Sequence, residues 1–355
     1  MKAPAFWYQT ESFAARVLLP FSYLYRLAAW LRGFRAKPYQ ANVPVICVGN
    51  VTAGGSGKTP TALALAALLQ KQGHKPVFVT RGYGGSQHGP LRVDITHHIA
   101  TNVGDEALLL VRQAPVWIGR NRAAAIQQAE KEATHIILDD GLQNPHIKPD
   151  LSLLVMDREM GIGNGHMIPA GPLREPLAEA LQRVTAIVMV GEENRSKSGG
   201  IPLPLAGGAR GGLGNRSTLF TSPPSVPPAS GRDAYAKPIL HARFHPLLPS
   251  DFPRTAKFFA FAGIGRPEKF YALCRKEELK LVATQDFADH HLFTEKDLQA
   301  LKQKAKTLGA TLLTTEKDFV RLPENFKANV LTFPIRLEFE DGAIIEALLD
   351  SCARK

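Results

Sequence analysis

The sequence predicts an α/β protein in which a parallel sheet is flanked by helices and followed by a smaller second α/β domain. Two observations support this fold class. Short runs of mostly apolar residues alternate with helix-forming segments, which is typical of a parallel sheet covered on both faces. After a stretch rich in Gly and Pro, the alternation begins again. The 355 residues, 45% of them hydrophobic and 21% charged, are enough for two ordinary cores.

The first expected element is a helix over residues 13–34, which are rich in Leu, Ala and aromatic side chains. Three arginines and Pro20 interrupt this stretch, so it fits neither a membrane-spanning helix nor a cleaved signal peptide. We expect residues 1–36 to form an amphipathic helix in the membrane interface, with Trp30 at the depth of the headgroups. The alternative is a helix that packs on the protein's own core.

Strands and helices then alternate along residues 37–191, which we expect to form the main domain. The expected strands are VPVICV, KPVFVT, ATHIILDDG, LSLLVMD and AIVMVG, and the expected helices cover residues 60–70 and the stretch after Gly104. In parallel sheets of this kind, active sites gather beyond the carboxyl ends of the strands.

Residues 192–231 break the alternation because they contain Gly-rich and Pro-rich runs with few positions that can enter a core. We expect a flexible surface insertion or linker there. Residues 232–355 contain two more strand-to-helix patterns, beginning at AKFFAF and ATLLTT. These residues are expected to form the second α/β domain and to complete the active site.

The cysteines and the net charge restrict the functional class. Cys47, Cys274 and Cys352 are widely scattered, which argues against a disulfide framework and against a zinc site. A formal net charge of +11 favours anionic partners: nucleic acid, a phosphorylated substrate or an acidic membrane leaflet. Charge alone does not choose among these three.

The segment between the first expected strand and helix has the composition of a phosphate-binding loop. Its members are Thr52, Ala53, Gly54, Gly55, Ser56, Gly57, Lys58 and Thr59. Such a loop presents backbone N–H groups to phosphate, its lysine reaches the β and γ phosphates, and its hydroxyl residue binds Mg²⁺. Thr52 stands where the usual pattern has Gly, and the alternative is a Gly-rich turn without a ligand. Residues 37–191 are therefore predicted to be a P-loop NTPase-like, nucleotide-binding core.

Two acids follow the strand ATHIIL, at the position where a P-loop site needs a carboxylate for Mg²⁺. They are Asp139 and Asp140. Because neighbouring side chains of a strand point to opposite faces, we expect one to face the metal and the other a supporting partner or the substrate. The alternative for Asp140 is a cap on the next segment.

Three further clusters lie near expected strand ends or helix starts. Arg81 ends the second strand, and Asp105 and Glu106 open a helix, where acids are commonly N-terminal caps. The third cluster is Asp289-His290-His291. A single histidine in such a place is more often structural than catalytic, and we keep that interpretation for His291.

Taken together, the motifs resemble one family closely. VGNVTAGGSGKTP, RGYGG, VGDEA, LDDGLQ, GPLREP, FAGIGRPEKF, DFADHH and TTEKD occur in the order seen in the tetraacyldisaccharide 4'-kinases, and they extend over nearly the whole chain. The resemblance implies transfer of the γ-phosphoryl group of ATP to the 4'-hydroxyl of an acylated disaccharide 1-phosphate lipid, the lipid A precursor.

The resemblance also implies a location and partners. The enzyme would act at the cytoplasmic face of the inner membrane as a peripheral protein, where a basic chain with an interfacial helix is attracted to the anionic membrane surface. No nucleic acid and no obligatory protein partner are expected.

The family's functional residues map onto this sequence. Asp105 matches the catalytic base, and His290 matches the histidine that orients or polarises it. Lys58 is the third expected catalytic residue. The nucleotide is expected to be bound by Thr52 to Thr59, Lys58 included, and by Gln143. The residues expected for Mg²⁺ are Thr59, Asp139, Asp140 and Glu106, and those for the substrate are Arg174 and Arg81. The alternative for Arg174 is a surface salt bridge with Glu175 or a neighbour. Since Asp105 and His290 belong to different expected domains, we expect domain closure during the catalytic cycle.

Two other classes of function compete with a kinase. One is a membrane-associated ATPase that acts as a nucleotide-dependent switch or binding module, although no Asn-Lys-x-Asp guanine-specificity stretch is present. The other is a nucleic-acid-binding ATPase, which only the charge favours, because no aromatic and basic recognition motif is evident.

Overall fold

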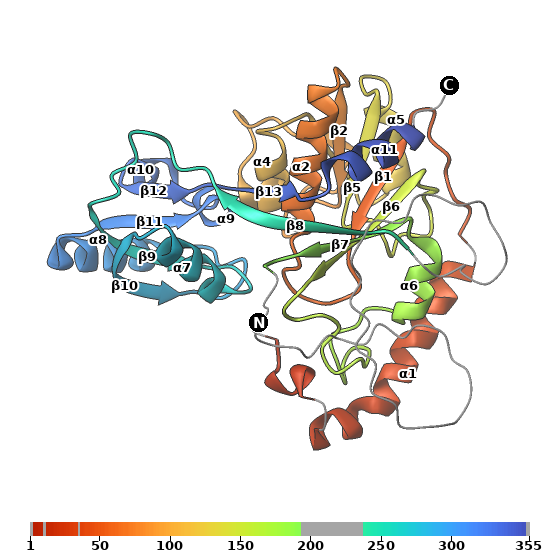
Figure 1. The fold of residues 1–355 in the computed structure, drawn as a ribbon, viewed down its shortest axis with the longest axis horizontal. Helices are drawn as coiled ribbons and strands as arrows, with labels where there is room; N and C mark the ends of the chain where they lie inside the picture. Colours follow the sequence, from red (N-terminus) through yellow and green to blue (C-terminus); the bar gives the residue numbers. More distant parts are fainter. Residues whose placement is uncertain (1–2, 10–11, 35, 193–236, 353–355) are drawn as a thin grey trace.

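The computed structural model describes residues 3–9, 12–34, 36–192 and 237–352. Two sheets organise these residues, a larger one of nine strands and a smaller one of four (Figure 1). This arrangement confirms the predicted α/β fold with a second, smaller α/β unit. The stretch 192–231, expected to be an insertion or linker, lies outside the described residues from position 193 onward.

The larger sheet is mostly parallel. Its strands are β1 (Val45–Gly49), β2 (Pro76–Thr80), β3 (Leu91–Arg92), β4 (Val116–Ile118), β5 (His135–Asp139), β6 (Leu151–Asp157), β7 (Ala186–Val190), β8 (Ile239–Pro246) and β13 (Ile335–Phe339). Their order is β13-β8-β7-β6-β1-β5-β2-β4-β3, and only β3 and β13 run antiparallel to their neighbours. β1 is therefore central, between β6 and β5.

The smaller sheet is entirely parallel, in the order β10-β9-β11-β12. Its strands are β9 (Lys257–Ala262), β10 (Lys280–Asp286), β11 (Thr311–Thr315) and β12 (Val330–Phe333), and its helices are α7 (Pro267–Lys276), α8 (Glu295–Leu308), α9 (Glu316–Phe319) and α10 (Glu324–Lys327). We call this unit the second domain. β8 leads out to it and β13 leads back, so residues 232–355 divide between the two sheets (Figure 1).

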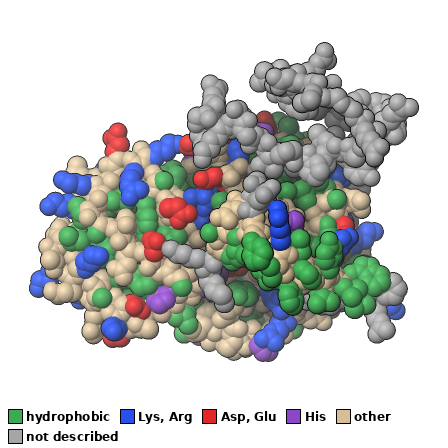
Figure 2. All heavy atoms as spheres, turned by 90° about the horizontal axis from the view of Figure 1, so that it is seen from below, with side chains coloured by type: hydrophobic (Ala, Val, Ile, Leu, Met, Phe, Trp, Pro, Cys, Tyr) green, Lys and Arg blue, Asp and Glu red, His purple; other side chains and the backbone are tan. Residues whose placement is uncertain are grey.

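The N-terminal segment lies along the edge of the larger domain. It consists of η1 (Ala5–Tyr8) and α1 (Phe13–Phe34), which has the bounds expected from the sequence. Ser22 Oγ donates to the carbonyl oxygen of Met167 at 2.8 Å and holds one side of α1 to the protein. The other side is apolar and exposed, and Figure 2 shows hydrophobic side chains gathered on this face of the molecule. Among the described helices, none is both long enough and apolar enough to cross a bilayer.

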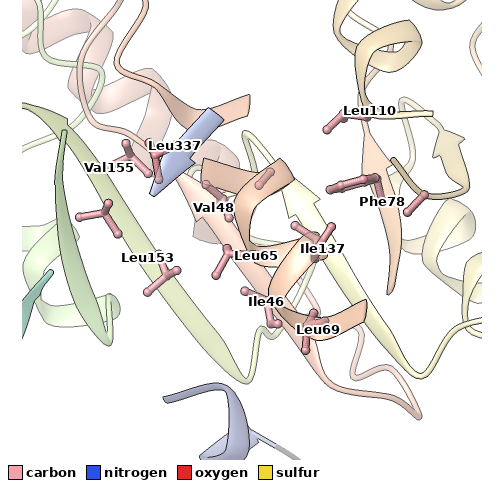
Figure 3. Close-up of a cluster of buried hydrophobic side chains, with 14 of the residues drawn as sticks. Ile46, Val48, Leu65, Leu69, Phe78, Leu110, Ile137, Leu153, Val155 and Leu337 are labelled. Carbon is pink, nitrogen blue, oxygen red and sulfur yellow. The ribbon is translucent and has the colours of Figure 1, made fainter. Parts of the chain in front are cut away.

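The remaining helices cover the larger sheet. They are α2 (Lys58–Lys71), α3 (Ala100–Val103), α4 (Asp105–Leu110), α5 (Arg122–Ala129), α6 (Leu177–Arg183) and α11 (Gly342–Cys352). β1 alternates its side chains between two cores: Ile46 packs with Leu65 of α2 on one face, and Cys47 lies in a separate cluster on the other. Figure 3 shows α2 packed in this way over the strands. Burial on both faces explains why the strand is continuously apolar.

Candidate active site

A cleft of about 1620 Å³ lies between the larger domain and the second domain. Of the residues expected from the sequence, the cleft is lined by Gly54, Gly55, Ser56, Gly57, Lys58, Thr59, Arg81, Glu106, Asp140, Arg174 and His290. The other expected residues are not part of this lining: Thr52, Ala53, Asp105, Asp139 and Gln143. The carboxyl ends of the parallel strands and the second domain thus bring most of the expected site together.

The loop between β1 and α2 is shaped by glycines. β1 ends at Gly49, and Gly57 is the N-cap of α2. Gly54 and Gly57 have φ angles of 115° and 94°, in a region that residues with a side chain rarely adopt. A Cβ atom on Gly54 would meet nothing within 4 Å, so its backbone borders open space in the cleft. The start of α2 is therefore accessible to an anion.

Thr52 and Ala53, the first two residues of this loop, are held by a neighbouring segment. The N–H group of Ala53 donates to the carbonyl oxygen of Pro172 at 2.8 Å, and Thr52 forms an antiparallel bridge with Leu173. Asn50 Nδ2 donates to the carbonyl oxygen of Thr52 at 2.7 Å. These two residues therefore shape the loop, and its cleft-lining part begins after them.

Lys58 is the cation at the start of α2, and its side chain is only 12% exposed. Its Nζ donates to Asn50 Oδ1 at 3.1 Å and lies 3.6 Å from Asp140 Oδ1. Asn50 thus orients Lys58, a role that the sequence patterns did not indicate. A single carboxylate and an amide hold this largely buried ammonium group at the edge of the cleft, where it can attract a phosphate group.

Asp139 has the properties of a cation ligand. It is 1% exposed, Thr59 Oγ1 donates to its Oδ2 at 3.2 Å, and its Oδ1 is buried without a hydrogen-bond partner among the described residues. Burial and the nearby carboxylates of Glu106 and Asp140 raise the pKa of Asp139 to about 7. A buried acid with an unsatisfied oxygen, beside a threonine hydroxyl, fits Mg²⁺.

No three Asp, Glu, His or Cys side chains converge as a metal cluster within the described part of the chain. Mg²⁺ commonly uses one or two carboxylates together with substrate phosphates and water, so the pair of Thr59 and Asp139 remains compatible with it. Glu106, another of the four expected metal residues, lines the cleft, and its Oε1 lies 3.7 Å from Lys317 Nζ.

Asp140 is placed differently from its neighbour. Its φ angle is 53°, and both carboxylate oxygens lie 3.2 Å from Nη1 of Arg174. Burial alone would raise the pKa of Asp140, but the charges of Lys58 and Arg174 outweigh it, so the pKa lies below its ordinary value. Arg174 thus pairs with a site carboxylate, whereas Glu175 pairs with Arg183.

Gln143 supports the loop from behind. Its Nε2 donates to the carbonyl oxygen of Asn50 at 2.7 Å and to Glu175 Oε1 at 2.8 Å. Both amide protons are therefore used by the protein itself. Gln143 therefore supports the end of β1 and is not part of the cleft lining.

Asp105 and His290 meet across the two domains. His290 Nδ1 lies 2.9 Å from Asp105 Oδ2, and the Glu106 N–H group donates to Asp105 Oδ1 at 2.9 Å. Burial would raise the pKa of Asp105, but the hydrogen bond with His290 and the charge of Lys317 outweigh it, so the pKa is lowered. Asp105 is therefore ionised at neutral pH. It is 4% exposed, while His290 lines the cleft in front of it.

Arg122 and Lys317, two of the cations that line the cleft, were not singled out from the sequence. Arg122 opens α5, lines the cleft and donates from Nη2 to the carbonyl oxygen of Asp140 at 3.2 Å. Lys317 is the second residue of α9, and its Nζ lies 3.2 Å from His290 Nε2. The position of Arg122 shortly after the end of a strand could have indicated it from the sequence. Lys317 was visible only as part of the motif TTEKD.

A family model described as Tetraacyldisaccharide-1-P 4'-kinase matches residues 14–353 of the chain. The chain belongs to this family. All the cleft residues of the tetraacyldisaccharide-1-P 4'-kinase site described above lie within the matched range, and the resemblance inferred from the motifs is confirmed.

Curated relatives have the corresponding name. The chain is 44% identical over 327 residues to the Tetraacyldisaccharide 4'-kinase of Parvibaculum lavamentivorans, covering 91% of this chain and 87% of the relative. It is 41% identical over 351 residues to the Tetraacyldisaccharide 4'-kinase of Paramagnetospirillum magneticum, covering 99% and 98%. A crystal structure of LpxK from Aquifex aeolicus in complex with ATP has the same fold, with a TM-score of 0.70 at 24% identity, over 96% of this chain and 99% of that one.

Proposed function

We propose that this kinase transfers the γ-phosphoryl group of ATP to the 4'-hydroxyl of a tetraacylated disaccharide 1-phosphate, the lipid A precursor. The observation that carries the proposal is that one cleft joins a phosphate-binding loop to a paired aspartate and histidine. The loop suits the donor, and the pair suits a hydroxyl acceptor.

The loop and its cations would bind the donor phosphates. Backbone N–H groups at the start of α2 would hold the phosphates, and Lys58 would place its charge on the β and γ groups. Arg174 and Arg81 line the same cleft and would bind the substrate's phosphate or the transferring group. Positioning and neutralisation of charge are the main contributions that a protein makes to phosphoryl transfer.

Thr59 and Asp139 would hold Mg²⁺, as their hydroxyl and unsatisfied carboxylate oxygen suggest. When bound, the cation neutralises negative charge on the β and γ phosphate oxygens. Asp140 lies beside Lys58 and Arg174 and would keep both cations oriented toward the phosphates.

Asp105 would act on the acceptor. As an ionised carboxylate it would take the proton of the sugar hydroxyl while the hydroxyl oxygen forms its bond to the γ-phosphorus. The bond between that phosphorus and the bridging β,γ oxygen breaks, and ADP leaves. His290 would orient Asp105 through their hydrogen bond.

The direct test is transfer of labelled γ-phosphate from ATP, with Mg²⁺ and detergent, to the tetraacyl disaccharide 1-phosphate. We expect a labelled lipid that forms only when the acceptor is present. Hydrolysis of ATP at the same rate with and without the acceptor, and no labelled lipid, would refute the acceptor and favour a nucleotide switch.

Asp139→Asn tests whether Asp139 binds Mg²⁺, because the substitution should remove the metal ligand without lowering the stability of the fold. The unfolded chain ionises Asp139 near its ordinary pKa of 3.8, whereas the folded protein does so only at about 7, so the free energy of unfolding falls as pH rises through this window. The difference corresponds to at most about 4 kcal/mol. Above roughly pH 7, we expect the variant without Mg²⁺ to melt at a higher temperature than wild type and to lack turnover.

Thermal unfolding with and without Mg²⁺ checks this prediction. Mg²⁺ should raise the melting temperature of wild type at about pH 8, where Asp139 is ionised, and leave Asp139→Asn unchanged. An equal response of both proteins to Mg²⁺ would show that Asp139 is not a ligand of the cation.

We further propose that α1 attaches the enzyme peripherally to the cytoplasmic face of the inner membrane. Its exposed side presents Phe13, Val17, Phe21, Leu24, Leu27 and Leu31, each more than half exposed, along one stripe of helical spacing. Ala15 and Ser22 face the protein. An apolar stripe of this length on a basic protein suits the interface of an anionic bilayer.

Phe21→Asp combined with Leu24→Asp should weaken binding to anionic vesicles by at least about 10-fold, because two apolar side chains lose their burial in the interface. Ile95→Asp with Ile99→Asp is a matched control, since these residues are 53% and 63% exposed but lie outside α1. Vesicle flotation measures both variants. Unchanged flotation of the α1 variant would contradict membrane attachment through this stripe.

A further inference from the structure

Lys317 lies where the second domain meets the larger one. It is in α9, which packs against α4, the helix that begins with Asp105. Its Nζ lies 3.2 Å from His290 Nε2, 3.7 Å from Glu106 Oε1 and 3.9 Å from Asp289 Oδ1. The two carboxylates balance the charge of the ammonium group, and the imidazole supplies a neutral acceptor.

These contacts restrict the hydrogen bonding of the His290 ring. An ammonium group can only donate, so Nε2 of the imidazole must accept from Lys317. In a neutral imidazole the other nitrogen then carries the proton, and Nδ1–H donates to Asp105 Oδ2. A ring held in this way offers no free lone pair to a substrate hydroxyl. The ionised carboxylate of Asp105 does.

The backbone around His290 is fixed independently of Lys317. The His290 N–H group donates to the carbonyl oxygen of Gly263 at 3.1 Å. Arg321, whose side chain is 1% exposed, donates from Nη2 to the same carbonyl and from Nη1 to the carbonyl oxygen of His291. Asp318 accepts from the Gly263 N–H group at 2.9 Å. The loop is thus held by buried contacts, and Lys317 contacts the ring itself at Nε2.

We propose that Lys317 is a positioning residue: by donating to Nε2 it holds the His290 ring in the orientation in which Nδ1–H donates to Asp105, the proton acceptor of the pair. This inference deepens the proposed function and rests on it for its effect on turnover. Lys317 and His290 both belong to the second domain, so Lys317 orients the ring within that domain, whereas the contact of the ring with Asp105 forms where the second domain lies against α4.

The test combines ¹⁵N NMR of the His290 ring with kinetics on the full chain in detergent, for wild type, Lys317→Met and Lys317→Arg. The ring signals are assigned by their loss in His290→Ala. Wild type should show the Nδ1–H tautomer with a hydrogen-bonded Nε2, and in Lys317→Met the Nε2 signal should move toward that of a ring nitrogen without a hydrogen bond while the proton stays on Nδ1. We expect kcat of Lys317→Met to fall about 10- to 100-fold, with the KM for ATP little changed and partial recovery in Lys317→Arg. Lys302→Met, an exposed lysine on α8, is the matched control and should keep wild-type values.

Three results would overturn the proposal: an unchanged Nε2 signal in Lys317→Met, a changed Nε2 signal with full turnover, or a loss that multiplies with that of His290→Ala in the double variant. In the last case Lys317 would act without His290. The NMR measurement needs no lipid, so it still decides the positioning role if wild type fails to phosphorylate the proposed acceptor. Failure of that reaction alone would refute the proposed function instead.

Discussion

Lys58→Ala is expected to lower phosphoryl transfer by about 10³-fold or more while the protein stays folded. Lys58 is the cation at the start of α2, and its contacts with Asn50 and Asp140 hold it at the cleft. Its loss removes the charge nearest the expected β and γ phosphates and leaves the carboxylate of Asp140 with less compensation. Both effects repel a polyanionic nucleotide.

Lys71→Ala provides the matched control for this variant. Lys71 is an exposed lysine in the last turn of the same helix, so its removal changes net charge equally without touching the cleft. Labelled phosphate transfer and equilibrium ATP binding should both be close to wild type in Lys71→Ala. Near-normal turnover of Lys58→Ala would refute the assignment of the loop to the donor phosphates.

Asp105→Ala is expected to lower kcat by roughly 10²- to 10⁴-fold, the usual contribution of a positioned base, with ATP binding largely kept. Asp105 is ionised at neutral pH and is oriented by His290 and by the backbone of Glu106. Single-turnover transfer and ATP binding, measured separately, distinguish a loss of chemistry from a loss of donor binding. Loss of ATP binding would assign Asp105 to the nucleotide site.

Comparison with His290→Ala decides which member of the pair takes the proton. If Asp105 is the base, its removal costs more than removal of His290, and the double variant is little worse than Asp105→Ala. The opposite order would assign the proton transfer to the imidazole, which lines the cleft in front of Asp105, and would make the carboxylate the orienting group.

Local patterns in the sequence predicted the elements that lie around β1 well. LSLLVMD forms β6 with the expected bounds, and the helix expected at 60–70 is α2. β8 and β13 were not expected, because each is a partly polar strand near the sheet edge: Arg243 and His245 interrupt the apolar pattern of β8. Their pairing joins residues about ninety positions apart in the chain, which no local pattern reports.

In the candidate site, too, local patterns predicted some residues, whereas contacts between distant segments determine the others. The loop composition indicated Lys58 and Thr59, because a phosphate loop needs those groups at that spacing. The contact between Asp105 and His290 required the family resemblance, since nothing in either segment points to the other. Lys317 could not be found from local sequence, because it lies 27 residues beyond His290 in the chain and meets it only in the folded second domain.

The return of the chain from the second domain affects how the protein is made. Leu337 of β13 and Ile345 and Leu349 of α11 belong to the same buried cluster as Ile46 and Leu65, beneath the phosphate-binding loop. Partners this far apart close a large loop, which is slow and costly in chain entropy. The core of the nucleotide domain is therefore incomplete until β13 and α11 leave the ribosome, and a chain that stops before them lacks part of that core while its second domain is already synthesised.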